Sequence, residues 1–322
     1  MKAIKALIPA AILLGTAGAA LAQSSVTIYG RLNESVERQK TNDDSKTVLQ
    51  NNASRLGFRG VEDLGGGLKA GFTLEHRLNA DTGASTNGNA FWGGAGESSV
   101  FLSGAFGQIK AGHYTSEAYF ATSDVTDLLN HGTGTSADQL YKYLNNDNNK
   151  VSYRTPSVAG LTAEAAVLLS EGVQPEKGYD VAVNYALGDL GLGLGYERDP
   201  LHNSQIAFRG SYSFSPVTIT GYVQRFKDDA LDASKNIGRV SAQYDIGALE
   251  LHAAVGIATE LDAAGTPTTE EGKARQFTVG VNYNLSKRTK VFTFFNHTKS
   301  DAIGVVAENK FQVFSLGVRH NF

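Results

Sequence analysis

Few residues of this sequence have the types and the spacing that catalysis or metal binding would need. The chain has no cysteine in 322 residues, which excludes disulfide bonds and thiolate metal sites. No two of its seven histidines stand at metal-ligand spacing on one strand face, and no serine is singled out beside His252 as a nucleophile would be. We therefore expect no enzyme activity, no cofactor and no metal site. Calcium binding by acidic loop residues such as Glu260 and Asp262 is an open alternative to plain solvated charge.

Arginine is the residue type whose placement suggests a function. If the backbone alternates with a period of two, Arg55, Arg59 and Arg154 all point away from the apolar face of their segments. The same rule places Arg31 and Arg77 on the polar side. Guanidinium groups gathered on one polar wall would attract anions. The formal net charge of -3 and the lack of a basic run argue against nucleic acid as a partner.

Residues 1–22 have the layout of a secretory signal peptide. Lys2 and Lys5 form a basic head, residues 6–20 are apolar or small, and residues 20–22 form a small-x-small cleavage site. A membrane anchor is the alternative, but the apolar run is shorter than the about 20 residues that a spanning helix needs. We expect a mature domain, residues 23–322, that is exported and is either soluble or a membrane β-barrel.

The rest of the chain alternates in steps of two, which is the signature of β-strands. In the first such segment, Val26, Ile28 and Leu32 share one face and polar residues share the other. About sixteen segments of roughly 8 to 15 residues follow this pattern, and spanning strands need about 9–11 residues. Glycine contributes 36 residues and the aromatic residues are mostly Tyr and Phe, a composition that suits strands better than helices.

The connections between these segments alternate between short and long. Tight turns are expected near residues 64–67, 104–107, 157–160, 188–191, 214–217, 246–249 and 284–288. Longer polar loops are expected near residues 38–49, 80–91, 116–147, 171–178, 198–203, 228–235, 259–274 and 299–308. With both termini on the short-turn side, this asymmetry is typical of outer-membrane barrels. A soluble β-sandwich or propeller is the alternative, but sandwich strands average only about 5–6 residues.

Four stretches make the resemblance specific. Residues 24–31, 54–70, 285–289 and 316–322 resemble the Gram-negative trimeric porins, particularly the β-proteobacterial and neisserial branch. The most specific is the second, whose Gly65-Gly66-Gly67 run suits a tight turn. Phe322 ends an alternating segment, as expected where the last strand closes on the first. The resemblance implies an all-β, sixteen-stranded antiparallel barrel with a long third loop folded into the lumen, and a homotrimer.

The resemblance also assigns roles to a few residues. The stretch from about Thr115 to Asn149 stands where the third loop of the family lies, and Asp124 and Asp127 would supply its carboxylates. Arg55 matches an arginine of the family's second strand, and Arg154 matches the arginine just after the third loop. At the loop tip, Asn130 and His131 replace a Pro and a Glu that are frequent in relatives, which leaves the charge of the tip open.

Sixteen strands would enclose an aqueous channel, whereas about eight leave only a filled interior. We therefore expect an outer-membrane general diffusion channel for small hydrophilic solutes and ions, with a weak anion preference, surrounded by outer-membrane lipid and lipopolysaccharide. The expected constriction residues are Arg31, Arg55, Arg59, Arg77, Arg154, Asp124 and Asp127. A substrate-selective channel and an outer-membrane β-barrel enzyme are the alternatives.

Overall fold

The structure is a computed structural model that describes residues 25–85, 96–131, 139–172, 176–263, 266–267, 271–301 and 307–322. The expected signal peptide, residues 1–22, lies outside the described residues. Within the described ranges, no helix is both long enough and apolar enough to cross a membrane.

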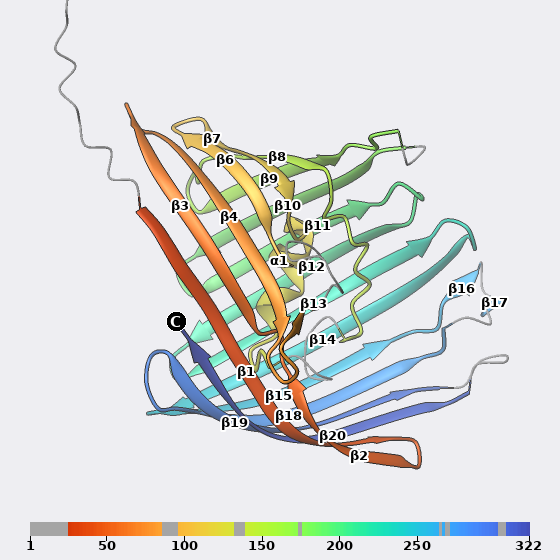
Figure 1. Cartoon of the computed structure of the whole chain (residues 1–322). Coiled ribbons are helices and arrows are strands. Elements are labelled where there is room, and N and C mark those ends of the chain that lie inside the picture. The colour runs from red at the N-terminus through yellow and green to blue at the C-terminus, as the bar shows by residue number, and fades with distance from the viewer. Residues whose placement is uncertain are drawn as a thin grey trace, which may run out of the picture.

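Sixteen antiparallel strands of the described chain form one closed barrel (Figure 1), which confirms the predicted fold class. Each strand pairs with the next barrel strand along the chain, and the barrel closes where β20 pairs with β1. The barrel strands are β1 (Ser25–Thr41), β3 (Arg55–Gly65), β4 (Leu68–Asn79), β6 (Ser98–Gly104), β7 (Gly107–His113), β8 (Lys150–Arg154), β9 (Leu161–Leu168), β10 (Gly178–Leu187), β11 (Leu190–Arg198), β12 (Ser204–Phe214), β13 (Val217–Asp228), β14 (Ala233–Ile246), β15 (Leu249–Ala258), β18 (Ala274–Asn284), β19 (Thr289–Ser300) and β20 (Asn309–Asn321).

Short strands extend some of the hairpins beyond the barrel. Strand β2 (Asp44–Asn51) pairs with the second half of β1, and β5 (Ala84–Ser85) pairs with the end of β4. Strands β16 (Asp262–Ala263) and β17 (Thr266–Pro267) pair with each other. All seven tight turns lie where the alternation predicted them, and all join strands at the same rim as Ser25 and Phe322.

Burial in this barrel is the reverse of burial in a soluble protein. On β1, the apolar Val26 and Ile28 expose 66% and 60% of their surface, while the polar Asn33, Ser35 and Glu37 expose 1% or less. Apolar side chains therefore cover the outside of the wall and polar side chains fill the inside. This is the arrangement of a barrel whose outer surface faces hydrocarbon and whose lumen is polar.

The described parts of the segment between β7 and β8, residues 114–131 and 139–149, fold into the barrel, as predicted for the third loop. We call this segment the lumen loop. It contains α1 (Glu117–Thr122) and η1 (Asp124–Thr126), and Figure 1 shows α1 inside the ring of strands. Helix α1 contacts β10, β11 and β12, and η1 contacts β13 and β14. The loop therefore follows the inner wall and narrows the lumen from that side.

Closure of the barrel depends on the last residue. The backbone of Phe322 exchanges two hydrogen bonds with Gly30 of β1, at 3.0 and 3.1 Å, and its ring covers the space where a Gly30 side chain would stand. We expect deletion of Phe322, or Gly30→Val, to lower the yield of folded barrel, measured as the heat-modifiable band in electrophoresis. Gly210→Val is the control, because no atom lies within 4 Å of a side chain added there. Equal folded yields for all three variants would contradict this role of the terminus.

Candidate pore constriction

The lumen loop is tied to the wall first at the start of α1. The Ser116 hydroxyl caps the helix by accepting from the Tyr119 N–H at 3.2 Å. The Asp180 carboxylate, on β10, accepts from the N–H groups of Glu117 and Ala118 at 2.8 and 3.0 Å. Asp180 also pairs with Lys150 of β8 at 3.3 Å, and both of these side chains are fully buried. A helix start favours a carboxylate because its N–H groups lack partners within the helix.

The middle of the lumen loop lies directly on the backbone of β11. Side chains added at Gly193 or Gly195 would overlap the carbonyl groups of Ala121 and Ala118, so only glycine allows α1 to approach this closely. Arg209 of β12 then donates from Nε to the Ala121 carbonyl at 2.8 Å. Gly193 and Gly195 of β11 thus form the surface on which the loop helix rests.

The tip of the lumen loop is fixed on the opposite part of the barrel. Leu129 is buried with Phe292 and Phe294, and the His131 ring stacks on Phe292 with centroids 3.5 Å apart. The Nε2 atom of His131 lies 2.7 Å from Asn282 Oδ1. Burial lowers the pKa of His131 well below its ordinary value, so the ring is neutral at pH 7. The charge of the tip, which the sequence left open, is therefore zero at this residue.

Three arginines occupy directly opposed positions on neighbouring strands. Arg31 of β1 pairs in register with Arg55 of β3, and Arg55 pairs in register with Arg77 of β4. Arg319 of β20 lies close enough to repel both Arg31 and Arg55 electrostatically. Like charges placed directly opposite each other destabilise a sheet. We call these four residues the arginine cluster, and its position on the lumen face calls for a functional reason.

The Glu75 carboxylate stands within the arginine cluster. Glu75 lies 2.9 Å from Arg77 Nε and 3.5 Å from Arg55 Nη1, and it also accepts from the Tyr29 hydroxyl at 3.2 Å. Arg31 instead donates to neutral oxygens, those of the Ala53 carbonyl at 3.2 Å and the Asn130 side chain at 3.4 Å.

Arg319 joins the arginine cluster to the lumen loop. It donates to the Asn130 carbonyl at 3.1 Å, so the loop tip touches the cluster at two of its arginines. The cluster therefore keeps a positive excess beside the loop.

The structure does not bring all the predicted arginines together. Arg59 lies near the short-turn rim, with its guanidinium 5.1 Å above the Tyr29 ring. Arg154 is exposed at the end of β8, where its Nε lies 3.4 Å from a Glu164 carboxylate oxygen of β9. Arg31, Arg55 and Arg77 thus form one group, and Arg59 and Arg154 lie apart from it.

The two predicted aspartates lie in the lumen loop with different surroundings. Asp124 begins η1 and is exposed, whereas Asp127 is half-buried and accepts from the Asn130 N–H at 3.1 Å. Asp127 therefore shapes the tip that Arg31 and Arg319 contact.

Sequence reasoning missed Arg319, Glu75, Lys150 and Asp180. Arg319 and Glu75 carry the same signal that selected Arg55, since both stand on the polar face of alternating segments. Lys150 and Asp180 are 30 residues apart and lie on different strands, and only the folded wall brings them together. Their partnership has no signal in the sequence.

Comparison with known proteins decides the family. The sequence profile of the Gram-negative porins matches residues 9–303. The chain belongs to the Gram-negative porin family. Outer membrane porin protein 32 of Delftia acidovorans is 30% identical over 98% of this chain and 95% of its own length. The major outer membrane protein P.IB of Neisseria sicca is 25% identical over 94% of this chain and 95% of its own length.

Solved structures agree with this assignment. The anion-selective porin from Comamonas acidovorans superposes with a TM-score of 0.74 at 27% identity, over 93% of this chain and 100% of that one. The resemblance drawn from residues 24–31, 54–70, 285–289 and 316–322 is confirmed, and so is the outer membrane as the location. The chain is an outer-membrane porin, and its family and relatives are channels.

Proposed function

We propose that this porin is a general diffusion channel for small hydrophilic solutes and ions, with a weak preference for anions set by the arginine cluster. The observation that carries the proposal is the in-register row of Arg31, Arg55 and Arg77. Arg319 adds a fourth positive charge, Glu75 lies between Arg55 and Arg77, and Glu250 and Asp127 attract Arg319. Such a row costs stability in the sheet, and its benefit is a positive potential at the narrowed part of the lumen.

The lumen loop supplies the opposite charge. Asp124, Asp127 and Glu117 all lie on this loop, and Glu164 lies on the wall beside α1. A polar solute that passes between the loop and the arginine cluster would align its dipole in the transverse field. Because the loop carboxylates offset much of the arginine charge, the preference should be weak. The similar porin from Comamonas acidovorans is anion-selective, which supports the sign of this preference.

A planar-bilayer recording across a KCl gradient tests the proposal. We expect a linear, unsaturated conductance and a reversal potential displaced modestly toward that of chloride. A reversal potential near that of potassium would overturn the anion preference. Conductance blocked at low concentration by one solute would instead indicate a substrate-selective channel.

We also infer that the porin assembles as a homotrimer. Strands β6 and β7 are only seven residues long and carry glycine, so this low part of the wall suits close contact between subunits. The Gly93 to Gly96 stretch, which was expected to contribute, lies outside the described residues except for Gly96. Mass measurement in mild detergent should give three copies, and conductance should close in three equal steps. A monomer mass together with single steps would contradict the trimer.

Glu117 makes the anion preference depend on pH near neutrality. Burial, helped by the neighbouring Glu164 carboxylate, raises the pKa of Glu117 to about 7. The carboxyl is therefore mostly charged at pH 8 and mostly neutral at pH 6, so the lumen loop loses one negative charge on acidification. We expect the reversal potential to move toward that of chloride between pH 8 and pH 6.

The matched variant for this prediction is Glu117→Gln, which stays neutral at both pH values. It should keep one reversal potential across the range, equal to that of the unmodified porin at pH 6. A full shift that persists in Glu117→Gln would assign the titration to another group.

A further inference from the structure

Two histidines face one asparagine where the tip of the lumen loop meets the wall. Asn282 of β18 donates from its amide nitrogen to Glu250 Oε2 at 2.9 Å and to His252 Nε2 at 3.1 Å, both on β15. These two contacts fix the orientation of the amide, so its oxygen faces the loop. That oxygen lies 2.7 Å from Nε2 of His131 at the loop tip. Nε2 of His131 therefore carries a proton and donates it to Asn282.

The other nitrogen of the His131 ring has no acceptor for a second proton. Its Nδ1 is buried without a hydrogen-bond partner among the described residues, and the residue as a whole is 0% exposed. One face of the ring stacks on Phe292. A proton added at Nδ1 would be a buried donor without an acceptor, which costs free energy.

The charges around His131 also oppose its protonation. Arg31 of β1, Lys290 of β19 and Arg319 of β20 each repel a positive charge at the ring. Burial, together with these three cations, holds the pKa of His131 well below its ordinary value. A tip that is bound to the wall in this way therefore contains a neutral ring.

The other titratable groups around the loop tip act on the ring indirectly. Glu250 and His252 of β15 reach it through Asn282, and Asp127 of the loop attracts Arg319. A proton on His252 Nε2 would remove one of the two acceptors that fix the Asn282 amide. Uptake of a proton by either histidine therefore weakens the attachment of the tip.

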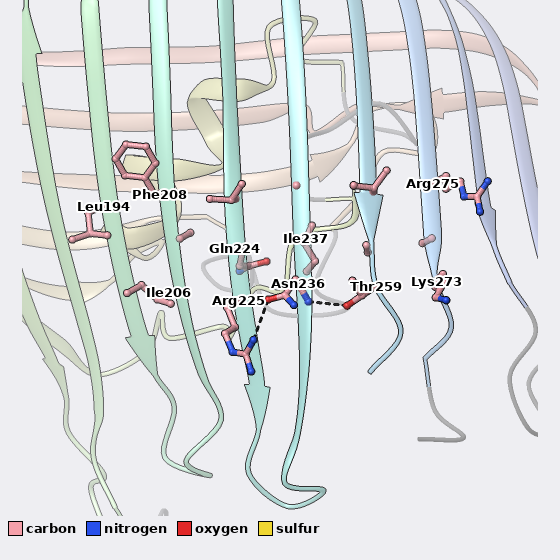
Figure 2. A pocket seen from close by; sticks show the side chains of 16 residues that line it. Leu194, Ile206, Phe208, Gln224, Arg225, Asn236, Ile237, Thr259, Lys273 and Arg275 are labelled. Atoms are coloured by element: carbon pink, nitrogen blue, oxygen red, sulfur yellow. Dashed lines mark hydrogen bonds between the residues drawn. The ribbon is translucent and has the colours of Figure 1, made fainter. Parts of the chain in front are cut away.

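The two arms of the lumen loop are attached to the wall by groups that keep their charge in mild acid. Gln224 of β13 (Figure 2) accepts from the Lys142 N–H and donates to the Lys142 carbonyl, both at 2.9 Å. Arg209 donates to the Ala121 carbonyl on the other arm. Amide and guanidinium groups do not titrate between pH 4 and pH 8. The arms can therefore stay in place while the tip leaves the wall.

We propose that His131 is a positioning residue that makes the constriction sensitive to acid. The neutral ring holds the loop tip on β18 and β19, and a proton on the ring releases the tip into the lumen. On release, Arg31 and Arg319 also lose their contacts with Asn130, so the constriction loses its fixed width. This inference concerns control of the pore by pH, goes beyond the proposed diffusion function, and holds whether or not the pore prefers anions.

The lowered pKa sets the direction of the pH dependence. A released ring titrates near the ordinary value of about 6.5, and a bound ring only well below it. The bound tip therefore has its full stability above about pH 6.5 and loses stability as the pH falls below that value. In this window, each pH unit shifts the ratio of bound to released tip about tenfold toward release.

Labelling of a single cysteine measures the release directly, because the chain has no cysteine of its own. Leu129→Cys places a thiol where the native side chain is 5% exposed and packs with Phe292 and Phe294. The probe is dithiodipyridine, which reacts with thiols even in acid. Lys287→Cys, at the exposed short-turn rim, gives the reference rate at each pH. We expect the relative rate at Leu129→Cys to rise about tenfold from pH 6 to pH 5.

Two variants separate His131 from the other groups that titrate in acid. His131→Gln keeps a donor for Asn282, His131→Phe keeps the stacking on Phe292, and neither takes up a proton. In either background, the relative rate at Leu129→Cys should change less than twofold over the same range. A tenfold rise that persists in both backgrounds, or a constant rate when His131 is present, would overturn the proposal.

His202→Asn is the control for loss of a histidine elsewhere. His202 lies between β11 and β12 and contacts Glu176 and Asp229 at 2.7 and 3.8 Å. Asparagine tolerates its left-handed backbone, at φ 72°. This control should show the full rise in labelling.

Single-channel recording gives a second measurement of release. The unmodified porin and His202→Asn should close more often at pH 5 than at pH 6, whereas His131→Gln should close equally often at both. Closures that increase equally in all three proteins would contradict the role of His131. The anion preference is measured by the reversal potential instead, so the failure of one proposal leaves the other standing.

Discussion

Lys150→Met should be among the most destabilising substitutions in this porin. It leaves the Asp180 carboxylate without its ion-pair partner in a position where both side chains are fully buried. Breaking a buried pair by removing one partner costs about 3–5 kcal/mol. Asp180 also holds the start of α1 through the N–H groups of Glu117 and Ala118, so the lumen loop should loosen with it. We expect a lower temperature for loss of the folded band in electrophoresis and noisier open-channel current.

Lys110→Met is the control for this substitution. Lys110 pairs with Glu97 at 2.9 Å, but these side chains keep 16% and 30% of their surface exposed. A partly solvated pair of this kind contributes about 0–1 kcal/mol. Lys110→Met should therefore unfold close to the unmodified porin and keep a quiet current. If Lys150→Met behaved like Lys110→Met, the Lys150–Asp180 pair would not be what fixes the loop.

The barrel could be predicted from the sequence because its signal is local. Each strand alternates along its own residues, as in Val26 to Leu32, and each tight turn lies within a few residues of its predicted place. Whether the apolar face of each strand points into the protein or out of the barrel has no such local signal. A soluble sheet and a porin wall share the pattern, and the choice between them came from strand length, loop asymmetry and resemblance. In the structure Val26 is exposed and Asn33 is buried, so the apolar face points out of the barrel.

The constriction could be predicted only in part, because its members are brought together by strands far apart in the sequence. The alternation of side chains along each strand placed Arg31, Arg55 and Arg77 on the lumen side. It could not show that they share one cross-strand row. That row depends on the register of three strands. The same alternation predicted Arg59 and Arg154 as constriction residues, and they face the lumen at other heights of the wall.

The attachments of the lumen loop had no sequence signal for the same reason. His131 meets Asn282 across 151 positions, and Glu117 meets Asp180 across 63. Gly193 is the clearest example of a loop contact that could not be predicted from the sequence. Its lack of a side chain is required by the close approach of α1, which belongs to the porin's own loop and is distant in the sequence.

Arg55→Ser should shift the ion preference of the porin toward cations. Arg55 stands at the centre of the arginine row, between Arg31 and Arg77, and it shares the Glu75 carboxylate with Arg77. A unit positive charge at 4 Å from a passing ion contributes about 1 kcal/mol in water, favourable for an anion and unfavourable for a cation, or about fivefold in the permeability of each ion. We expect a shift of that order in the reversal potential across a KCl gradient, at an unchanged folded yield.

Arg154→Ser is the informative partner for this substitution, since resemblance assigned both arginines to the constriction. The Arg154 side chain is 46% exposed at the end of β8, against 26% for Arg55, so solvent and salt screen the charge of Arg154 more strongly. Its effect on the reversal potential should have the same sign as that of Arg55→Ser and be several-fold smaller. Arg59→Ser, beside Tyr29 and nearer the short-turn rim, should change the potential least. Equal shifts for Arg55→Ser and Arg59→Ser would show that the field is set by total lumen charge. The cross-strand row would then have no special part in selectivity.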